Sequence, residues 1–344
     1  MAEETTLLLD LPPATWPEWF EQNGGKAFHG RIAARWVFKR GVSDWNQMSD
    51  LPTALREQLA AEHPLLQSKL EASSNSTDGA CKVLLRFPDG GAVEAVSMPG
   101  TQGLTICLST QIGCPVRCPF CASGASGLER NLRPSEILEQ VLWLWREHGE
   151  FGRIVVMGMG DAGFNLTPVL KALDSLIDKK GGGLSPRRIT LSTVAPPRAL
   201  ATIAEWGRPI NVAISLHAAD DKLRQELVPG IAKRTVLETI EEAEQLFASS
   251  HREYTIEYVL LAGVNDSIEQ AQRLANLLHG RRCHLNLIPY NEVEGFGFSR
   301  PTLPACEEFA AVTIKAGIST TLRRSLGRSN NAACGQLRLH QQLT

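Results

Sequence analysis

The sequence predicts an α/β protein whose main domain is a parallel sheet curled into a partial barrel, preceded by a small helical domain. The first observation is an alternation of short β-rich runs with longer helical runs, which begins at Thr105 and forms six units. Such an alternation is typical of β/α units, whose strands pair in parallel. The second observation is that residues 1–72 differ from the rest, with helical spacing and three tryptophans in the first 36 positions.

Each expected strand of the barrel is rich in β-branched or apolar residues and is followed by a helical pattern. We expect the strands at 105–110, 153–160, 187–193, 210–217, 255–264 and 283–290. We expect helices at 134–149, 167–179, 197–206, 267–280 and 303–317, with a longer helical region after residue 217. Sites on such barrels gather at the C-terminal ends of the strands. The candidate cofactor-binding residues there are Gly160, Asp161, Ser192, Ser215, Leu216, His217 and Asn291.

The part of the chain before the barrel divides into two predicted segments. Residues 1–72 form the helical domain, in which Arg31, Arg35 and Lys39 share one helix face. Two interpretations of this face are open, because a row of cations either contacts RNA phosphates or is simply solvated. Residues 73–99 form a polar linker or turn followed by a β-hairpin, and Glu94 lies on the second strand of that hairpin. Residues 100–344 are the predicted barrel with its C-terminal segment.

Composition limits the class of protein. A formal net charge of −2 gives no global sign of a nucleic-acid partner, so any basic surface must be local. No apolar run reaches the roughly 20 residues of a membrane span, and the start MAEETTLLLDLPP lacks the positive charge of a signal peptide. Eight cysteines in 344 residues are too few for a disulfide scaffold. We therefore expect a cytoplasmic protein with no membrane partner.

Three cysteines stand close together in GCPVRCPFCASG. Cys114, Cys118 and Cys121 have the spacing C-x3-C-x2-C, with no fourth cysteine nearby. Thiolates are the usual ligands of a [4Fe–4S] cluster, and a cluster held by three of them keeps one iron open for a substrate. Structural zinc sites generally add a second cysteine pair or histidines, which this run lacks. The alternative is three unrelated or zinc-binding cysteines, but the spacing is that of the radical S-adenosylmethionine (SAM) enzymes.

Almost the whole chain resembles the RlmN/Cfr family of radical SAM RNA methyltransferases. The motifs that carry the resemblance are FHGRIAARWVFKRG, TICLSTQIGCPVRCPFCASG, VVMGMG, LSPRRITLST, ISLHAADD, TIEYVLLAGVND, LNLIPYN and NAACGQL. The last one is the most discriminating, because few radical SAM enzymes place a cysteine, here Cys334, in such a motif at the far end of the chain.

The resemblance implies a radical reaction at adenine. One SAM methylates Cys334, a second SAM bound to the cluster starts the radical step, and the carbon on Cys334 joins the base. Cys107 matches the family's resolving cysteine, which attacks the sulfur of Cys334 and leaves a disulfide. Glu94 matches the proposed proton acceptor. Without the resemblance, Cys334 is a lone cysteine and Cys107 a buried strand residue.

The implied substrate is C2 of an adenine in the peptidyl-transferase centre of 23S rRNA, and in certain tRNAs the adenine 3′ of the anticodon. A reductase or a flavodoxin-type protein is the expected electron donor. Two alternatives are open: a Cfr-type enzyme that methylates adenine C8, and an RNA-binding paralogue that has lost turnover.

The sequence departs from the family pattern at several places. The usual GMGEP reads GMGDA, so Asp161 reaches one methylene less far than the glutamate it replaces. The acidic residues that usually precede AACGQL are Ser329, Asn330 and Asn331. The basic tail of many relatives is absent after Gly335. We expect these changes to alter the handling of SAM or RNA while leaving every required thiol in place.

Overall fold

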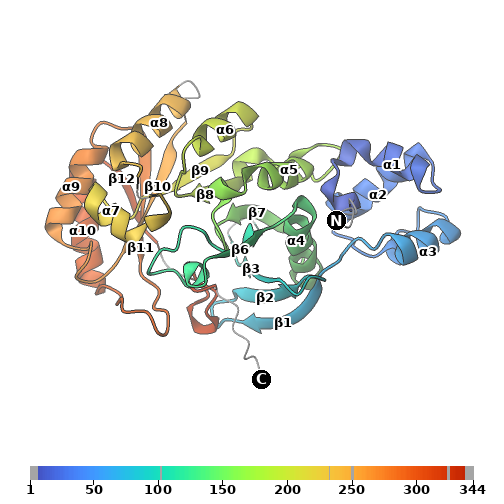
Figure 1. The fold of residues 1–344 in the computed structure, drawn as a ribbon, viewed down its shortest axis with the longest axis horizontal. Coiled ribbons are helices and arrows are strands. Elements are labelled where there is room, and N and C mark those ends of the chain that lie inside the picture. Colours follow the sequence, from blue (N-terminus) through green and yellow to red (C-terminus); the bar gives the residue numbers. More distant parts are fainter. Residues whose placement is uncertain (1–6, 101–102, 232, 249–251, 324–325, 338–344) are drawn as a thin grey trace.

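The computed structural model describes residues 7–100, 103–231, 233–248, 252–323 and 326–337. Helices of the N-terminal region lie at one end of the molecule, and the barrel lies at the other (Figure 1). The N-terminal region contains α1 (Trp16–Gln22), α2 (Ala27–Arg40) and α3 (Thr53–Glu62), with short 3₁₀ turns at Leu8–Asp10, Pro13–Thr15 and Trp45–Gln47. Buried aromatic side chains hold these helices together, among them Trp16, Phe20 and Trp45.

One face of α2 is exposed, as the spacing of its cations predicts. Arg31, Arg35 and Lys39 all lie on the solvent side, while Val37 and Phe38 are buried. Lys39 Nζ donates a hydrogen bond of 2.7 Å to the Gly182 carbonyl in the barrel domain. The exposed face is therefore available to a partner, and its end is attached to the barrel.

A single sheet of ten strands forms the rest of the scaffold, in the order β1-β2-β3-β4-β7-β8-β9-β10-β11-β12. The first four strands pair antiparallel: β1 (Lys69–Asn75), β2 (Cys81–Arg86), β3 (Ala92–Met98) and β4 (Leu104–Cys107). From β4 onward every pairing in the sheet is parallel. The remaining strands are β7 (Phe151–Val156), β8 (Ile189–Thr193), β9 (Asn211–Ser215), β10 (Tyr254–Leu260), β11 (Cys283–Pro289) and β12 (Ser319–Leu322).

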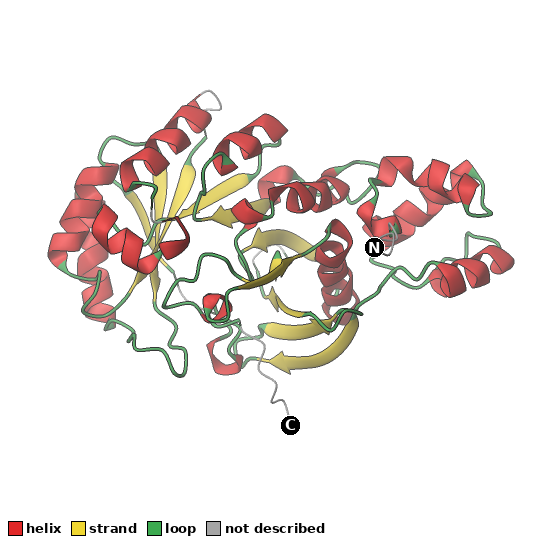
Figure 2. Cartoon of the chain, in the orientation of Figure 1, coloured by secondary structure: helices red, strands yellow, loops and turns green. Residues whose placement is uncertain are grey.

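The helices between the parallel strands cover the outside of the curled sheet (Figures 1 and 2). They are α4 (Pro134–His148), α5 (Leu166–Ile177), α6 (Ala199–Trp206), α7 (Asp221–Leu227), α8 (Val236–Ala248), α9 (Ile268–Leu278) and α10 (Leu303–Lys315). Their starts follow from local chemistry: the Asp220 and Ser267 side chains accept backbone N–H groups of α7 and α9, and Pro134 begins α4. The predicted barrel of six β/α units is confirmed, and β12 extends it by a seventh parallel strand.

Two kinds of local prediction need correction. Ser73–Asn75, expected in a linker, complete β1 and pair with β2, so this strand crosses the predicted boundary between residues 72 and 73. The strands expected at 105–110, 153–160, 210–217 and 255–264 end earlier, at Cys107, Val156, Ser215 and Leu260. Residues 157–160 leave the sheet as a loop. The predicted hairpin is present as β2 and β3, with Glu94 on its second strand.

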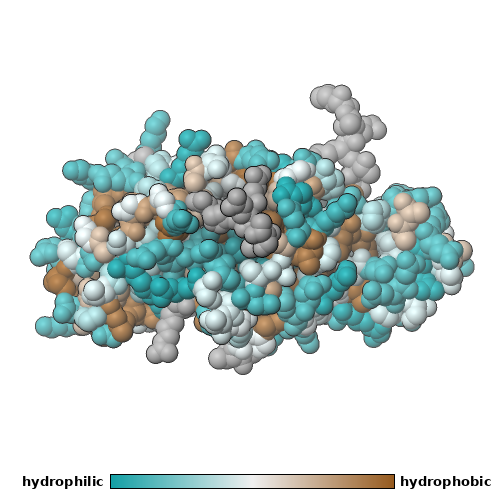
Figure 3. Space-filling model, turned by 90° about the horizontal axis from the view of Figure 1, so that it is seen from below, coloured by the Kyte–Doolittle hydropathy of each residue, from teal (hydrophilic) through white to brown (hydrophobic). Residues whose placement is uncertain are grey.

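Within the described ranges, no helix is both long enough and apolar enough to cross a bilayer. The face in Figure 3 is largely hydrophilic, and its hydrophobic side chains occur in small scattered groups.

Candidate active site

The loop that carries the three cysteines lies between two short paired strands. These strands are β5 (Gln111–Gly113) and β6 (Leu128–Asn131), which pair antiparallel. Gly113 closes the loop in a left-handed conformation, with φ +74°, and a Cβ at this position would meet the Gly127 carbonyl oxygen at 1.9 Å. Only glycine fits there. The pair of strands therefore fixes where the cysteine loop begins and ends.

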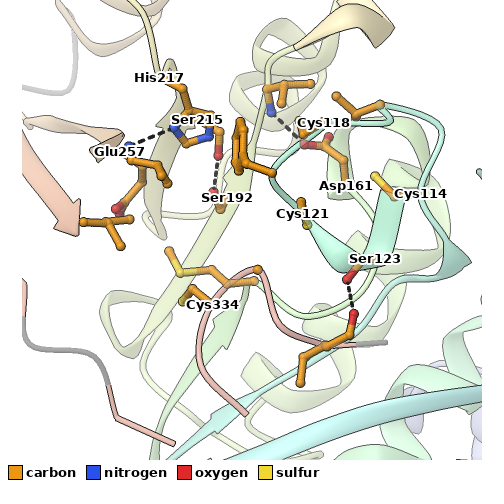
Figure 4. A pocket seen from close by; sticks show the side chains of 18 of the residues that line it. Cys114, Cys118, Cys121, Ser123, Asp161, Ser192, Ser215, His217, Glu257 and Cys334 are labelled. Carbon is orange, nitrogen blue, oxygen red and sulfur yellow. Dashed lines mark hydrogen bonds between the residues drawn. The ribbon is translucent and has the colours of Figure 1, made fainter. Parts of the chain in front are cut away.

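Cys114, Cys118 and Cys121 line one cavity at the C-terminal ends of the barrel strands. Figure 4 shows the three thiols on one side, with Ser192, Ser215, His217 and Glu257 on the opposite wall. Burial raises the pKa of all three thiols, that of Cys114 to about 12. A bound metal centre reverses this preference, because a coordinating thiol is deprotonated. Three soft sulfur donors from one loop, facing a shared cavity, fit a [4Fe–4S] cluster.

Asp161 lines the cavity, but its carboxylate is occupied by the protein. Thr193 Oγ1 and the Gly163 N–H donate to Oδ1 at 2.7 and 2.9 Å, and the Val194 N–H donates to Oδ2 at 2.7 Å. Burial raises the pKa of Asp161 to about 6, against the effect of these hydrogen bonds. The short side chain therefore holds the loop after β8 in place.

Gly160 makes room for a neighbouring side chain. It has φ +91°, and a Cβ would meet the Gln111 side chain at 2.6 Å. Gln111 Oε1 in turn accepts the Asp161 N–H at 2.8 Å. Gly160, a predicted cofactor-binding residue, thus packs closely against β5.

The wall from β8 and β9 is polar. Ser192 and Ser215 lie 3.1 Å apart through their hydroxyl groups. His217 has φ +61°, and its Nδ1 accepts the Val259 N–H at 3.2 Å. Burial lowers the pKa of His217 to about 3, so the ring is neutral and carries its proton on Nε2. These three residues lie in the cavity wall, as predicted.

Leu216 does not belong to the site. Its side chain is fully buried in the main hydrophobic core and does not line the cavity, whereas Ser215 and His217 do. β9 ends at Ser215 and His217 has a positive φ; between them the Leu216 side chain packs into the core, away from the cavity.

The segment that contains Cys334 is attached to the cavity rim on both sides. Asn291 Nδ2 donates to the Cys334 carbonyl at 3.1 Å, so this predicted cofactor-binding side chain holds the protein backbone. The Ala122 N–H donates to the Gly335 carbonyl at 2.8 Å. Ser123 Oγ donates to the Leu337 carbonyl at 2.7 Å. Cys334 itself is exposed and lies opposite the three cysteines (Figure 4).

A second cavity adjoins the first. Cys107, at the end of β4, lines this second cavity and is buried. Five residues line both cavities and so form a shared wall: Met157, Ile288, Arg323, Cys334 and Leu337. The structure thus brings Cys107 and Cys334 to one cavity, although 227 positions separate them in the sequence (334 minus 107).

Glu94 is buried on β3 and lines neither cavity. It forms a buried ion pair of 2.8 Å with Lys82 Nζ, and both side chains are less than 10% exposed. Lys82 Nζ also donates to the Asn331 carbonyl at 3.3 Å. Lys82 therefore connects the hairpin to the segment of Cys334.

Sequence reasoning missed Lys82, Glu257 and Arg323. Glu257 is buried on β10, and its Oε2 lies 3.7 Å from Arg323 Nη1. A signal exists for Lys82 and Glu257, because a charged residue in an otherwise apolar strand needs a partner. Lys82 and Glu94 carry such charges in the two strands of the same hairpin.

Comparison with known proteins agrees with this geometry. The family model of the radical SAM superfamily matches residues 108–275, and that of the ribosomal RNA large subunit methyltransferase N-terminal domain matches residues 6–64. Proteins named probable dual-specificity RNA methyltransferase RlmN, from Rhodopirellula baltica and Thermus thermophilus, are 42% and 41% identical to the chain. Each alignment covers 93% of this chain, with 87% and 91% of the respective relative.

A solved structure supports the same assignment over nearly the full length. A radical SAM methyltransferase from Sphaerobacter thermophilus matches with a TM-score of 0.93 and 36% identity, over 97% of this chain and 99% of that chain. The predicted resemblance and fold class are therefore confirmed, and with them the [4Fe–4S] cluster and SAM as cofactors. The chain belongs to the RlmN family of radical SAM RNA methyltransferases.

Proposed function

We propose that this enzyme methylates C2 of adenine in 23S rRNA and in tRNA, and that Cys334 carries the methyl group during the reaction. The observation that carries this proposal is the position of Cys334 in the shared wall of the two cavities. One cavity is lined by the three cysteines of the cluster loop, and the other by Cys107. A sulfur at this position faces both the source of the methyl group and a second thiol. The relatives' name, dual-specificity RNA methyltransferase, supports two kinds of RNA substrate.

The chemistry of the substrate requires such a carrier. C2 of adenine is an electron-poor carbon and a weak nucleophile, so it does not displace a methyl group from SAM directly. When bound at Cys114, Cys118 and Cys121, the cluster together with SAM supplies the radical chemistry that this carbon needs. Cys334 accepts the methyl group as a thiolate nucleophile and holds it at the cavity. Its sulfur then links the protein to the base.

Release of the product uses the second cavity. Cys107 attacks the sulfur of Cys334, which breaks the bond between that sulfur and the methylene carbon and forms a disulfide. Glu94 takes the proton from the ring carbon. Its carboxylate is tied through Lys82 to the backbone of Asn331, three residues before Cys334, but it lines neither cavity in this structure, so this role rests on the family resemblance.

We place SAM against the polar wall of the first cavity. Ser192, Ser215 and His217 offer two hydroxyl groups and a neutral imidazole that carries its proton on Nε2. Asp161 and Asn291 act by holding backbone beside the bound SAM, since their side chains already satisfy protein groups. Gly160 contributes backbone to the same wall. A reductase or a flavodoxin-type protein delivers the electron.

The test is the mass of the tryptic peptide that contains Cys334, from protein produced with iron and purified without oxygen. We expect an added methyl group in the wild type and none in Cys114→Ala. Cys283→Ala is the matched control, because this cysteine lies on β11 and lines neither cavity. An unmodified Cys334 in protein that contains cluster and SAM contradicts the carrier role.

Nucleoside mass spectrometry tests the position of the methyl group and its RNA. Total rRNA and tRNA are compared between cells with and without the gene. We expect loss of 2-methyladenosine from both fractions on deletion. Loss of 8-methyladenosine identifies a Cfr-type enzyme instead, and loss of neither product favours an RNA-binding paralogue.

A further inference from the structure

The second cavity is an unfavourable place for a thiolate. Apart from its two cysteines and Arg323, it is lined by apolar side chains: Met98, Val155, Met157, Ile288, Leu326, Ala332, Ala333 and Leu337. An anion in such surroundings loses its hydration and gains little in return. Burial and, less strongly, a charge on Cys334 raise the pKa of Cys107 to about 12, although a backbone hydrogen bond from Met157 and the Arg323 charge both act to lower it. The thiol that has to attack Cys334 is therefore held in its unreactive, protonated form.

Arg323 is the one cationic side chain in the lining of that cavity, among the residues that the structure describes. It follows β12 directly, and its backbone N–H donates to the Leu287 carbonyl at 2.8 Å, which fixes its position. The nearby guanidinium lowers the pKa of Cys107. Arg323 also lines the first cavity, so its side chain, like that of Cys334, borders both cavities.

The charged groups around Arg323 leave its guanidinium able to interact with the thiols of Cys107 and Cys334. Glu257 is its carboxylate partner, at 3.7 Å, which is longer than a hydrogen bond. Glu257 Oε1 accepts the Asn286 amide at 3.0 Å, so this carboxylate is itself held by β11. On the other side of Cys107, the buried charged side chains of the hairpin are Lys82 and Glu94, which pair with each other.

We propose that Arg323 is a positioning residue that stabilises the thiolate of Cys107 for its attack on Cys334. This inference rests on the proposed function. In the step it assists, the Cys107 sulfur anion forms a bond to the Cys334 sulfur while the bond from that sulfur to the methylene carbon breaks. The electron pair of the broken bond goes to the carbon attached to the base, which takes a proton from solvent. The two sulfurs are oxidised to a disulfide, and the carbon is reduced to the methyl group.

The experiment measures the covalent adduct between the protein and an RNA substrate, a 23S rRNA fragment that contains the target adenine. Anaerobic holoenzyme is mixed with SAM, reductant and RNA, and the adduct is followed by denaturing gel electrophoresis from pH 6.5 to 9. The variants are Arg323→Met, Arg323→Lys and Cys107→Ala, with Arg153→Met as the control. Arg153 is an exposed residue on β7 that lines neither cavity.

We expect Cys107→Ala to accumulate adduct without resolving it. Arg323→Met should form adduct and resolve it about tenfold more slowly than the wild type at pH 7, because a pKa one unit higher leaves one tenth of the thiolate. The rate of this variant should rise about tenfold for each pH unit, as the wild-type rate does, so that near pH 8 it reaches the wild-type rate at pH 7. Arg323→Lys should restore most of the rate at pH 7. The methyl content of Cys334 is measured in every variant to separate slow resolution from a loss of methyl loading, and Arg153→Met should match the wild type in both.

Three outcomes overturn the inference. If Arg323→Met resolves the adduct at the wild-type rate throughout the pH range, the charge is not needed. If Arg323→Met and Arg323→Lys both lose Cys334 methylation and adduct formation alike, Arg323 is structural. If Cys107→Ala gives no adduct at all, the proposed function fails as well, and the two failures are thus distinguishable.

Discussion

The buried ion pair between Lys82 and Glu94 makes the substitution Lys82→Met strongly destabilising. The pair is 2.8 Å long, and the two side chains are 9% and 5% exposed. Removing one partner of a buried pair costs about 3–5 kcal/mol, because the remaining charge stays in a poorly solvated site. The Asn331 carbonyl also loses its Lys82 donor, which adds about 1 kcal/mol. We expect a loss of about 4–6 kcal/mol in the free energy of unfolding.

The same hairpin supplies a matched control. Arg86 on β2 pairs with Glu71 on β1, but each of these side chains is 42% exposed. An exposed ion pair contributes about 1 kcal/mol or less. Arg86→Met should therefore leave the unfolding free energy nearly unchanged.

The assay is urea-induced unfolding, followed by circular dichroism under anaerobic conditions with the cluster loaded. The double variant Lys82→Met with Glu94→Gln removes both charges, and it should recover about 2–3 kcal/mol of the loss. The reasoning is refuted if Lys82→Met costs no more than Arg86→Met. It is also refuted if the double variant is as unstable as Lys82→Met alone, since the cost then does not come from the loss of the Lys82 partner of Glu94.

Three further predictions concern other parts of the molecule. Burial lowers the pKa of His217 to about 3, so protonation favours the unfolded chain as the pH falls below the ordinary value of 6.5. This residue should therefore lower the free energy of unfolding by about 2 kcal/mol between pH 7 and pH 5. Urea midpoints measured at the two pH values should show that the His217→Gln variant lacks this pH dependence. Asn330→Ala removes amide hydrogen bonds to β1 and the turn after it, at 2.9 and 3.4 Å. Peptide mass spectrometry should then show severalfold less methyl on Cys334 at unchanged iron content. RNA affinity should fall steeply with salt. Replacing Arg31 and Arg35 by Gln should lower the slope of log K against log salt by about 0.7–0.9 for each phosphate that the protein no longer neutralises. Fluorescence anisotropy between 50 and 200 mM KCl measures this slope, and an unchanged slope would mean that the helix face does not contact RNA.

The sequence predicts the barrel well because its strands are apolar and regularly spaced. It misses β12 because Ser319–Leu322 is only four residues long and three of these residues are polar. It misses β1 because Lys69–Asn75 is an edge strand with a mostly polar composition, which is typical of a turn or linker. Both strands form through pairing with a neighbour, so their own sequences carry little signal.

The candidate site is predictable where one motif supplies several residues. The three cluster cysteines come from one loop, whereas the structure places the side chain of Leu216, a predicted cofactor-binding residue, in the core. The roles of Asp161 and Asn291 could not be predicted from a motif, because each side chain binds a backbone group that only the tertiary structure brings near. The contact of the Cys334 segment with Lys82 is equally non-local, because 249 positions separate Lys82 from Asn331.

The anchoring of the Cys334 backbone determines how the sulfur moves. With the Cys334, Gly335 and Leu337 carbonyls all held by hydrogen bonds, the backbone is fixed while the side chain is exposed. In the mechanism proposed above, a change of the Cys334 rotamer is the motion that takes the sulfur from one cavity toward the other. Exposed side chains change rotamer in picoseconds to nanoseconds, whereas loops and domains move far more slowly. On that mechanism, transfer between the two cavities needs no movement of the backbone and is too fast to limit the enzyme.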